Sequence, residues 1–253
     1  MVAAPDLLPP LPEAWDRGLA VVAHPEDLEY GAASAVARGT DQGKQVTYVL
    51  ASRGEAGIDG MGPAEASRVR EAEQRASAAV VGVDTVEFLG LADGVLEPGL
   101  DLRRRLARAV RRHRPEVLVS INFRLTFGGT SFNMTDHRVL GVALLDAARD
   151  AANRWVFTDL VDEGHEPWAG TRLACFGGSP EPTHAVDVTG WLDRGVASLA
   201  EHRAYLTGLG DGGGGGGGGG GMADPDAFLR PMAEAAGRAA GVTHAVTFEV
   251  FEL

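Results

Sequence analysis

The chain alternates short, continuous runs of apolar residues with longer segments of helical pattern. Four such runs occupy residues 18–23, 45–52, 85–89 and 116–122. A strand with apolar residues on both sides of its pleat is covered on both faces, and helices between consecutive strands favour parallel connections. The pattern therefore predicts an α/β fold, in which helices flank both faces of a mostly parallel sheet.

The intervening segments have the composition and spacing of helices. We expect these helices over residues 29–42, 64–81, 100–114 and 136–152. Beyond Asn153 the order is less regular: we expect extended segments or strands at 154–157, 172–176 and 185–188, a helix at 191–206 and a closing strand at 244–253.

Length and composition favour one folded domain. The chain has 253 residues, of which 45% are hydrophobic, enough for a sizeable core. We expect a single domain over residues 1–253, with an N-terminal extension up to residue 17. The uninterrupted glycine run 212–221 costs too much entropy to order, so we expect a flexible glycine-rich loop at 211–224.

Charge and sequence patterning restrict the partners. The chain carries 23 basic and 35 acidic side chains, a net charge of −12, which argues against nucleic acid and anionic membranes as partners. No apolar stretch has the length of a membrane span, and residues 1–15 lack the pattern of a signal peptide. Cys175 is the single cysteine, so an internal disulfide is excluded. We expect a cytoplasmic protein; its oligomeric state stays open, homo-oligomers included.

Chemically suggestive residues follow two of the predicted strands. His24-Pro25-Glu26-Asp27 follows the first run, and the loop 123–137 follows the fourth. The carboxyl ends of parallel strands meet at one edge of a sheet, where ligands bind. Imidazole and carboxylate are ligands that suit zinc. His24 and Asp27 can then face one point, which leaves Glu26 free as a proton acceptor. The pattern alone also allows Asp27 to cap the next helix.

The first motif resembles a known family signature. Residues 23–31, AHPEDLEYG, resemble the AHPDDxE-type signature of the LmbE/PIG-L family of zinc-dependent de-N-acetylases. Weaker matches follow in the family's order: SRGEAG at 52–57, the Arg- and Glu-rich helix at 70–73, and Asp-His-Arg at 136–138. The resemblance implies a Rossmann-like α/β fold and hydrolysis of an N-acyl group, commonly acetyl on an amino sugar.

The same resemblance implies roles for four residues. His24, Asp27 and His137 match the three zinc ligands, and Glu26 matches the general base. Zinc is the expected cofactor, with Fe²⁺ or another divalent ion as the alternative for these ligands. Zinc lowers the pKa of bound water from about 15.7 to about 7 and polarises a carbonyl oxygen. Glu26 would accept the water proton and pass it to the departing amine.

The chain departs from the family pattern at two positions. Position 26 is Glu where Asp is usual, and Met134 stands where the pattern has a histidine that would stabilise the oxyanion or protonate the leaving group. We expect Asn133 to contact the substrate as a hydrogen-bond donor to the oxyanion. His184 is a candidate substitute for the missing histidine, with a structural role as the alternative.

Three further sets of residues carry expectations. Asp136 is expected to assist catalysis by orienting a ligand imidazole, with a helix N-terminal acid as the alternative. Arg53, on the loop after the second strand, is expected to contact the substrate unless it forms a surface ion pair. In the helix at 101–114, Leu102 and Leu106 belong to an inward apolar stripe, so we expect its arginines to form a solvated face.

These inferences predict a metal-dependent hydrolase that removes an N-acyl group from an amino sugar or a related small conjugate. The partner is then a small N-acylated molecule. Met134 motivates one alternative, a catalytically weak zinc-binding protein that captures a sugar or peptide. A nucleotide-binding α/β module is a third hypothesis, against which stands the absence of a GxGxxG pattern after any predicted strand.

Overall fold

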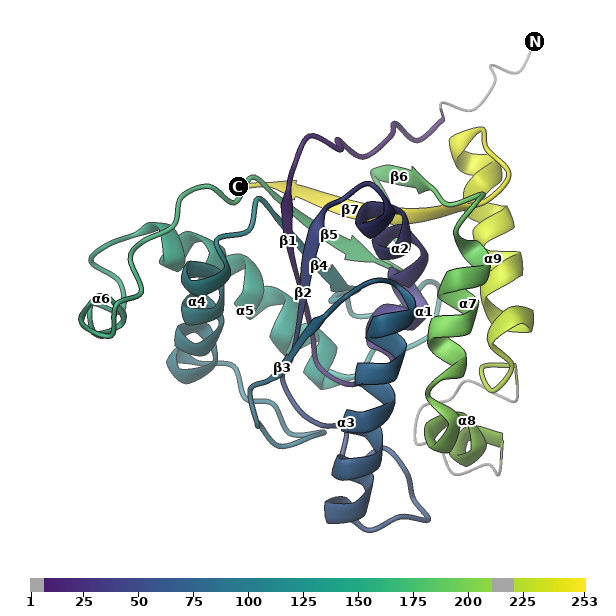
Figure 1. Cartoon of the computed structure of the whole chain (residues 1–253), viewed down its shortest axis with the longest axis horizontal. Coiled ribbons are helices and arrows are strands. Elements are labelled where there is room, and N and C mark those ends of the chain that lie inside the picture. Colours follow the sequence, from purple (N-terminus) through teal and green to yellow (C-terminus); the bar gives the residue numbers. More distant parts are fainter. Residues whose placement is uncertain (1–6, 211–220) are drawn as a thin grey trace.

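The computed structural model describes residues 7–210 and 221–253 (Figure 1). Within them, seven strands form one sheet in the order β3-β2-β1-β4-β5-β7-β6. The strands are β1 (Arg17–Val22), β2 (Gln45–Leu50), β3 (Thr85–Phe88), β4 (Val117–Ile121), β5 (Leu173–Gly177), β6 (His184–Asp187) and β7 (Ala245–Glu252). The helices are α1 (Asp27–Gly31), α2 (Ala33–Asp41), α3 (Pro63–Val80), α4 (Leu100–His113), α5 (Thr135–Ala152), α6 (Asp159–Asp162), α7 (Leu192–Ala200), α8 (Arg203–Gly210) and α9 (Pro225–Ala240).

Five of the strands run parallel, which confirms the predicted fold class. β1 pairs with β2 on one side and with β4 on the other, while β7 is antiparallel to both β5 and β6. After β2 and β3 have extended the sheet in one direction from β1, β4 and β5 extend it in the other. The strand order thus reverses between β1 and β4, and the carboxyl ends of the strands at such a switch point are the usual place for a ligand in an open α/β sheet.

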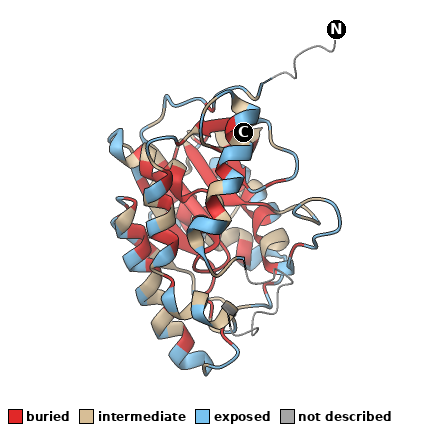
Figure 2. Cartoon of the chain, turned by 90° about the vertical axis from the view of Figure 1, so that its right-hand side faces the viewer, coloured by how far each residue is buried: buried red, intermediate tan, exposed pale blue. Residues whose placement is uncertain are grey.

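Helices cover both faces of the sheet. In Figure 1, α4 and α5 lie to the left of the sheet, and α1 to α3 with α7 lie to its right. Alternate residues of β1 therefore enter different cores: Leu19 packs with α4 and α5, whereas Ala20 packs with α1 to α3. Figure 2 shows the buried strands enclosed between partly exposed helices. This double coverage explains why the strands read as continuous apolar runs.

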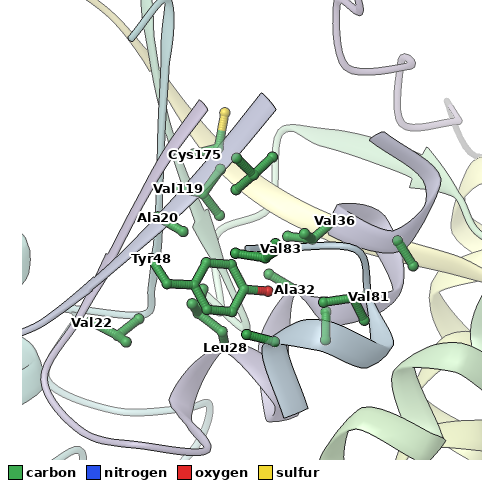
Figure 3. Packing of buried hydrophobic residues seen from close by; sticks show 14 of the residues in the cluster. Ala20, Val22, Leu28, Ala32, Val36, Tyr48, Val81, Val83, Val119 and Cys175 are labelled. Carbon is green, nitrogen blue, oxygen red and sulfur yellow. The ribbon is translucent and has the colours of Figure 1, made fainter. Parts of the chain in front are cut away.

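Tyr48 occupies the middle of the core on the α1–α3 side. Figure 3 shows its ring between the strand residues Ala20 and Val22, the α1 residue Leu28 and Ala32, which lies between α1 and α2. All five side chains are fully or almost fully buried. The contacts fix the start of α1 against the end of β1, and this is the junction that carries His24 to Asp27.

Two expected helices are each divided, and one expected strand is absent. The segment 29–42 forms α1 and α2 with a break at Ala32, because Gly31 packs closely on Ile121 and Gly177 at the end of the sheet. The helix expected at 191–206 forms α7 and α8, separated at the buried His202. In the described residues, 154–157 form turns rather than a strand.

Most of the glycine run lies outside the described residues, and residues 221–224 form a turn. None of the helices in the two described ranges is both long and apolar enough to cross a membrane.

Arg111 corrects the expectation that the arginines of α4 form a solvated face. Its side chain is buried, and its guanidinium donates to backbone carbonyls at and beyond the end of α5. The five acceptors are the carbonyl oxygens of Asp150, Ala151, Asn153, Val156 and Phe157, at 2.8–3.3 Å. A helix ends with carbonyls that have no partner within the helix, and a buried arginine can satisfy several of them. Arg111 therefore ties α4 to the end of α5.

We expect Arg111→Ala to lower the free energy of unfolding by about 3 kcal/mol, because it leaves buried carbonyls without donors. Urea denaturation followed by circular dichroism measures the change. Arg105→Ala is the matched control on the same helix: Arg105 forms a solvent-exposed pair with Asp101, and such pairs contribute little. Equal stability of the two variants would contradict the assignment.

Candidate functional site

The polar residues that follow β1 and β4 meet at the carboxyl edge of the sheet. β1 leads into the turn His24–Asp27, and β4 leads through the loop 122–134 into α5, which carries His137. Asp27 Oδ1 lies 3.1 Å from His137 Nε2, and the two histidine rings are 5.3 Å apart. The structure thus brings His24, Asp27 and His137 together from segments more than 100 residues apart.

The turn after β1 is shaped by Asp27 and Glu26. The Asp27 carboxylate accepts the backbone N–H of His24 at 2.8 Å, which closes the turn. Glu26 adopts a left-handed backbone conformation, with φ of 73°. A non-glycine residue pays a steric cost in this region, and such residues concentrate at functional sites. The strain directs Glu26 toward α3 and leaves Asp27 between the two imidazoles.

Two carboxylates hold His24 from behind. Its Nε2 lies 3.0 Å from Asp93 Oδ1 and 3.2 Å from Asp136 Oδ2. Asp136 is fully buried and also accepts the backbone N–H groups of Gly94 and Leu96. Because carboxylates only accept, Nε2 of His24 donates to them, which leaves Nδ1, 3.5 Å from Asp27, as the ring nitrogen available to a cation. Asp136 thus contacts the imidazole of a candidate ligand, as expected. This imidazole belongs to His24, and not to the neighbouring His137.

Asn133 fixes His137 in the same way. Its amide nitrogen donates to the carbonyl oxygens of Asn122 and Arg124, at 2.8 and 3.0 Å. Its Oδ1 must then accept from Nδ1 of His137, at 2.9 Å, so Nε2 of His137 keeps the lone pair that faces Asp27. The expectation that Asn133 donates to an oxyanion is wrong, because both of its amide hydrogens are already engaged by the backbone.

The resulting donor set fits one divalent cation. Two imidazole lone pairs and the Asp27 carboxylate converge on one point, and their nearest atoms lie within 4.8 Å of one another. Such an arrangement is repulsive unless a proton or a cation lies between the groups. Imidazole ligands whose other nitrogen is held by a carboxylate or an amide are typical of protein metal sites.

The pKa directions agree with a site that favours positive charge. Burial lowers the pKa of His24, but Asp27, Asp136 and Asp93 outweigh it and raise that pKa well above its usual value. Burial likewise raises the pKa of Asp27, but His137 and His24 outweigh it and hold the pKa below its usual range. These directions describe the side chains without a cation.

His24, Asp93 and Asp136 form a second group with metal-like spacing. Backbone N–H groups already bind these carboxylates: Gly94 and Leu96 donate to Asp136, and Ala56 donates to Asp93. We therefore interpret this group as the support of His24, and the first group as the cation site.

Glu26 lies beside the cation site and is held from α3. Its carboxylate forms a buried ion pair with Arg70, whose guanidinium also donates to the carbonyl oxygens of Gly54 and Pro25. Its backbone N–H donates to Gln74 Oε1, at 3.1 Å. Burial raises the pKa of Glu26, and Arg70 opposes that rise. The contacts fix the carboxylate on the α3 side of Asp27.

Arg53 and His184 are not brought into this site. The Arg53 guanidinium donates to Glu71 at 2.8 Å and stacks on Phe88, which is the surface ion-pair alternative. His184 begins β6, and β4, β5 and β7 separate β6 from β1 in the sheet. Its Nδ1 contacts Thr183. Neither residue takes the place of the histidine missing at Met134.

Sequence reasoning missed Asp93 and undervalued Arg70. Asp93 follows β3, whose carboxyl end lies at the same sheet edge, so the rule that led to His24 could have found it. No pattern marks the residue, because its neighbours 89–94 form an irregular loop. Arg70 enters the sequence analysis only as part of the Arg- and Glu-rich helix at 70–73, whereas in the structure it pairs with Glu26, in the turn after β1.

Fold and site together define the class: an α/β protein with a candidate cation site of two histidines and one aspartate at the switch point of its sheet. The chain belongs to the GlcNAc-PI de-N-acetylase (PIG-L) family, which it matches over residues 19–148, just over half of its length. The match confirms the resemblance found in the sequence and includes every residue of the cation site.

Individual proteins resemble this chain in sequence or in fold. The diacetylchitobiose deacetylase of Thermococcus kodakarensis is 25% identical over 192 residues, which cover 74% of this chain and 68% of that protein. An N,N'-diacetylchitobiose deacetylase from Pyrococcus horikoshii has a similar fold, with a TM-score of 0.82, 20% identity, and coverage of 94% of this chain and 85% of that one. The 4-carboxy-2-hydroxymuconate hydratase of Pseudomonas putida is also similar, with a TM-score of 0.72, 20% identity, and coverage of 93% and 95%.

We expect Asn133→Ala to weaken zinc binding by about 10- to 100-fold, because His137 loses the acceptor that fixes its ring. Competition with a chromogenic chelator measures the affinity, and circular dichroism checks that the fold is retained. His184→Ala is the control and keeps the wild-type affinity. A loss of equal size in both variants would contradict the arrangement described above.

Proposed function

We propose that this protein is a metal-dependent amidohydrolase that removes an N-acyl group, acetyl in its relatives, from an amino sugar or a related small conjugate. The observation that carries the proposal is the convergence of His24, Asp27 and His137 on one point, with Glu26 beside it. Membership of the de-N-acetylase family and similarity to a diacetylchitobiose deacetylase support the choice of reaction.

Zinc is the proposed ion, held by Nδ1 of His24, a carboxylate oxygen of Asp27 and Nε2 of His137. Two imidazoles and one carboxylate are a set that zinc accepts, with a position left open. A divalent ion held there would polarise the acyl carbonyl and the attacking water.

Glu26 moves the protons. As a carboxylate it accepts a proton from the water whose oxygen attacks the acyl carbon. The carbon–nitrogen bond then breaks, and Glu26 returns the proton to the departing amine. The products are a carboxylic acid, which keeps the second hydrogen of the water, and an amine; in solution they ionise to a carboxylate and an ammonium ion, so atoms and charge balance without a co-reactant. Arg70 keeps the carboxylate in position through both transfers.

The histidine missing at position 134 makes Glu26 the single proposed proton carrier. Met134 is partly exposed, the Asn133 amide is engaged, and His184 lies three strands away. Asp136 is a positioning residue, because it contacts His24 and two backbone N–H groups.

The fold alone does not select this reaction, since a hydratase shares it. Met134 favours one alternative, a zinc-binding protein that captures a sugar without turnover. The two hypotheses differ in one measurable property: amine release by the metal-loaded protein.

We expect Glu26→Gln to lower kcat by about 100-fold or more, because the amide cannot accept the water proton. Zinc content, measured by atomic emission, should remain that of the wild type, since Glu26 is not a proposed ligand. Amine release from N-acetylglucosamine and its oligomers is followed with a fluorogenic amine reagent. Glu87→Gln, a change in an ion pair with Arg112 outside the site, is the control.

Two results would contradict the proposal. If the metal-loaded wild type and Glu26→Gln release amine at the same slow rate from every amide tested, the proposed hydrolase function is wrong. If the wild type binds sugar and zinc but releases no amine, the binding-protein alternative replaces it.

A further inference from the structure

A small hairpin projects beside the cation site between β4 and α5. Its two arms meet at the antiparallel bridge between Thr126 and Phe132, with backbone bonds from Phe127 to Ser131 and from Asn133 to Leu125. At its tip, Gly128 and Gly129 have positive φ angles of 125° and 54°, which permit the reversal. The hairpin, defined as residues 124–134, leads directly into the helix of His137.

The hairpin exposes an unusual share of apolar side chains. Of the eleven large hydrophobic residues exposed in the described parts of the chain, four lie between positions 125 and 134: Leu125, Phe127, Phe132 and Met134. Leu125 is 60% exposed, Phe127 is 46% exposed and Phe132 is 66% exposed. Exposed apolar side chains that gather in one place mark binding surfaces more often than scattered ones do.

The pairing register assigns these residues to two faces. Residues opposite each other in an antiparallel pair share a face, and side chains alternate along each arm. Leu125, Phe127 and Asn133 therefore share one face, and Phe132 lies on the other. The contacts agree: Asn133 bonds to His137, and the Phe127 ring meets the His137 ring edge-on, with centroids 6.3 Å apart. Phe132 instead lies under the guanidinium of Arg138.

The cation site therefore has a polar side and an apolar side. Glu26, its partner Arg70 and the stacked Tyr205 lie on the α3 and α8 side. The Phe127 ring lies against His137 on the hairpin side, and Leu125 shares the Phe127 face of the hairpin.

This asymmetry orients an amide substrate. The nitrogen receives its proton from Glu26 and so lies on the polar side, where the hydroxyls of a sugar also find partners. The acyl carbon chain leaves the carbonyl in the opposite direction, toward His137 and the hairpin.

We propose that the Leu125–Phe127 face of the hairpin is an acyl-chain subsite, and that the preferred substrates carry an unbranched acyl group longer than acetyl. This inference rests on the proposed amidohydrolase function. An acetyl group ends at the carbonyl-bearing site and leaves Phe127 in water, whereas a chain of six to eight carbons covers Phe127 and Leu125. Each buried methylene favours binding by a factor of about four when it is fully removed from water.

The test compares N-acetyl- and N-octanoylglucosamine as substrates of the zinc-loaded full chain, below the micelle concentration of the longer amide. We expect kcat/KM to be at least about tenfold higher for the octanoyl substrate. Phe127→Ser should reduce that ratio to near one. Phe132→Ser removes an equally exposed phenylalanine from the other face of the same hairpin, and should keep the ratio.

A binding measurement makes the test independent of turnover. Calorimetry on the zinc-loaded protein compares the affinities for acetohydroxamate and octanohydroxamate. We expect Phe127→Ser to remove the preference for octanohydroxamate and Phe132→Ser to keep it. If amides are hydrolysed but the length of the acyl chain has no effect on kcat/KM, the subsite proposal is wrong and the proposed hydrolase function is supported. If no amide is hydrolysed but octanohydroxamate binding depends on Phe127 alone, the subsite proposal is supported and the proposed hydrolase function is wrong. Equal effects of Phe127→Ser and Phe132→Ser would overturn the subsite.

Discussion

The arrangement of the site depends on Asp27, one buried carboxylate that faces two imidazoles. One of its oxygens closes the turn after β1 by accepting the His24 N–H, and the other faces His137. Each imidazole has its outer nitrogen engaged as a donor, by Asp93 and Asp136 or by Asn133. Both inner lone pairs are thereby directed at Asp27. These hydrogen bonds determine which nitrogen of each ring is available to a cation.

This preorganisation has a structural cost that the surrounding fold has to offset. Glu26 has a strained backbone, and its carboxylate is buried. A buried charge is tolerated when it is paired and hydrogen-bonded, and Arg70 supplies that pairing from α3. Arg70 is itself held by carbonyls from the first and second loops of the sheet edge. The edge therefore forms one connected polar layer between the two apolar cores, in which the loss of one partner would leave another without compensation.

Much of the fold could be predicted from the sequence, because doubly covered parallel strands have a simple pattern. The runs at 18–23 and 116–122 define β1 and β4, and the carboxyl-edge rule then brings His24 and His137 together. The role of Asn133 could not be predicted, since it depends on which carbonyls the hairpin presents to its amide. The separation of His184 from the site was equally hidden. It follows from the insertion of the antiparallel β7 between β5 and β6, a long-range pairing that no local pattern records. Arg111 differs from its neighbours on α4 only through the end of α5, which lies some forty residues away.

The change at position 134 falls at the end of the hairpin that leads into the helix of His137. In the family pattern this position is a histidine that would stabilise the oxyanion or protonate the leaving group. Here the Phe127 ring lies against His137, whereas Glu26 and its partner Arg70 lie on the α3 side. A surface without proton-transfer groups can still contribute binding energy, which accelerates a reaction when it positions the scissile bond. Under the proposed mechanism, Glu26 alone moves the protons, and the Phe127 face of the hairpin contributes by holding the acyl group.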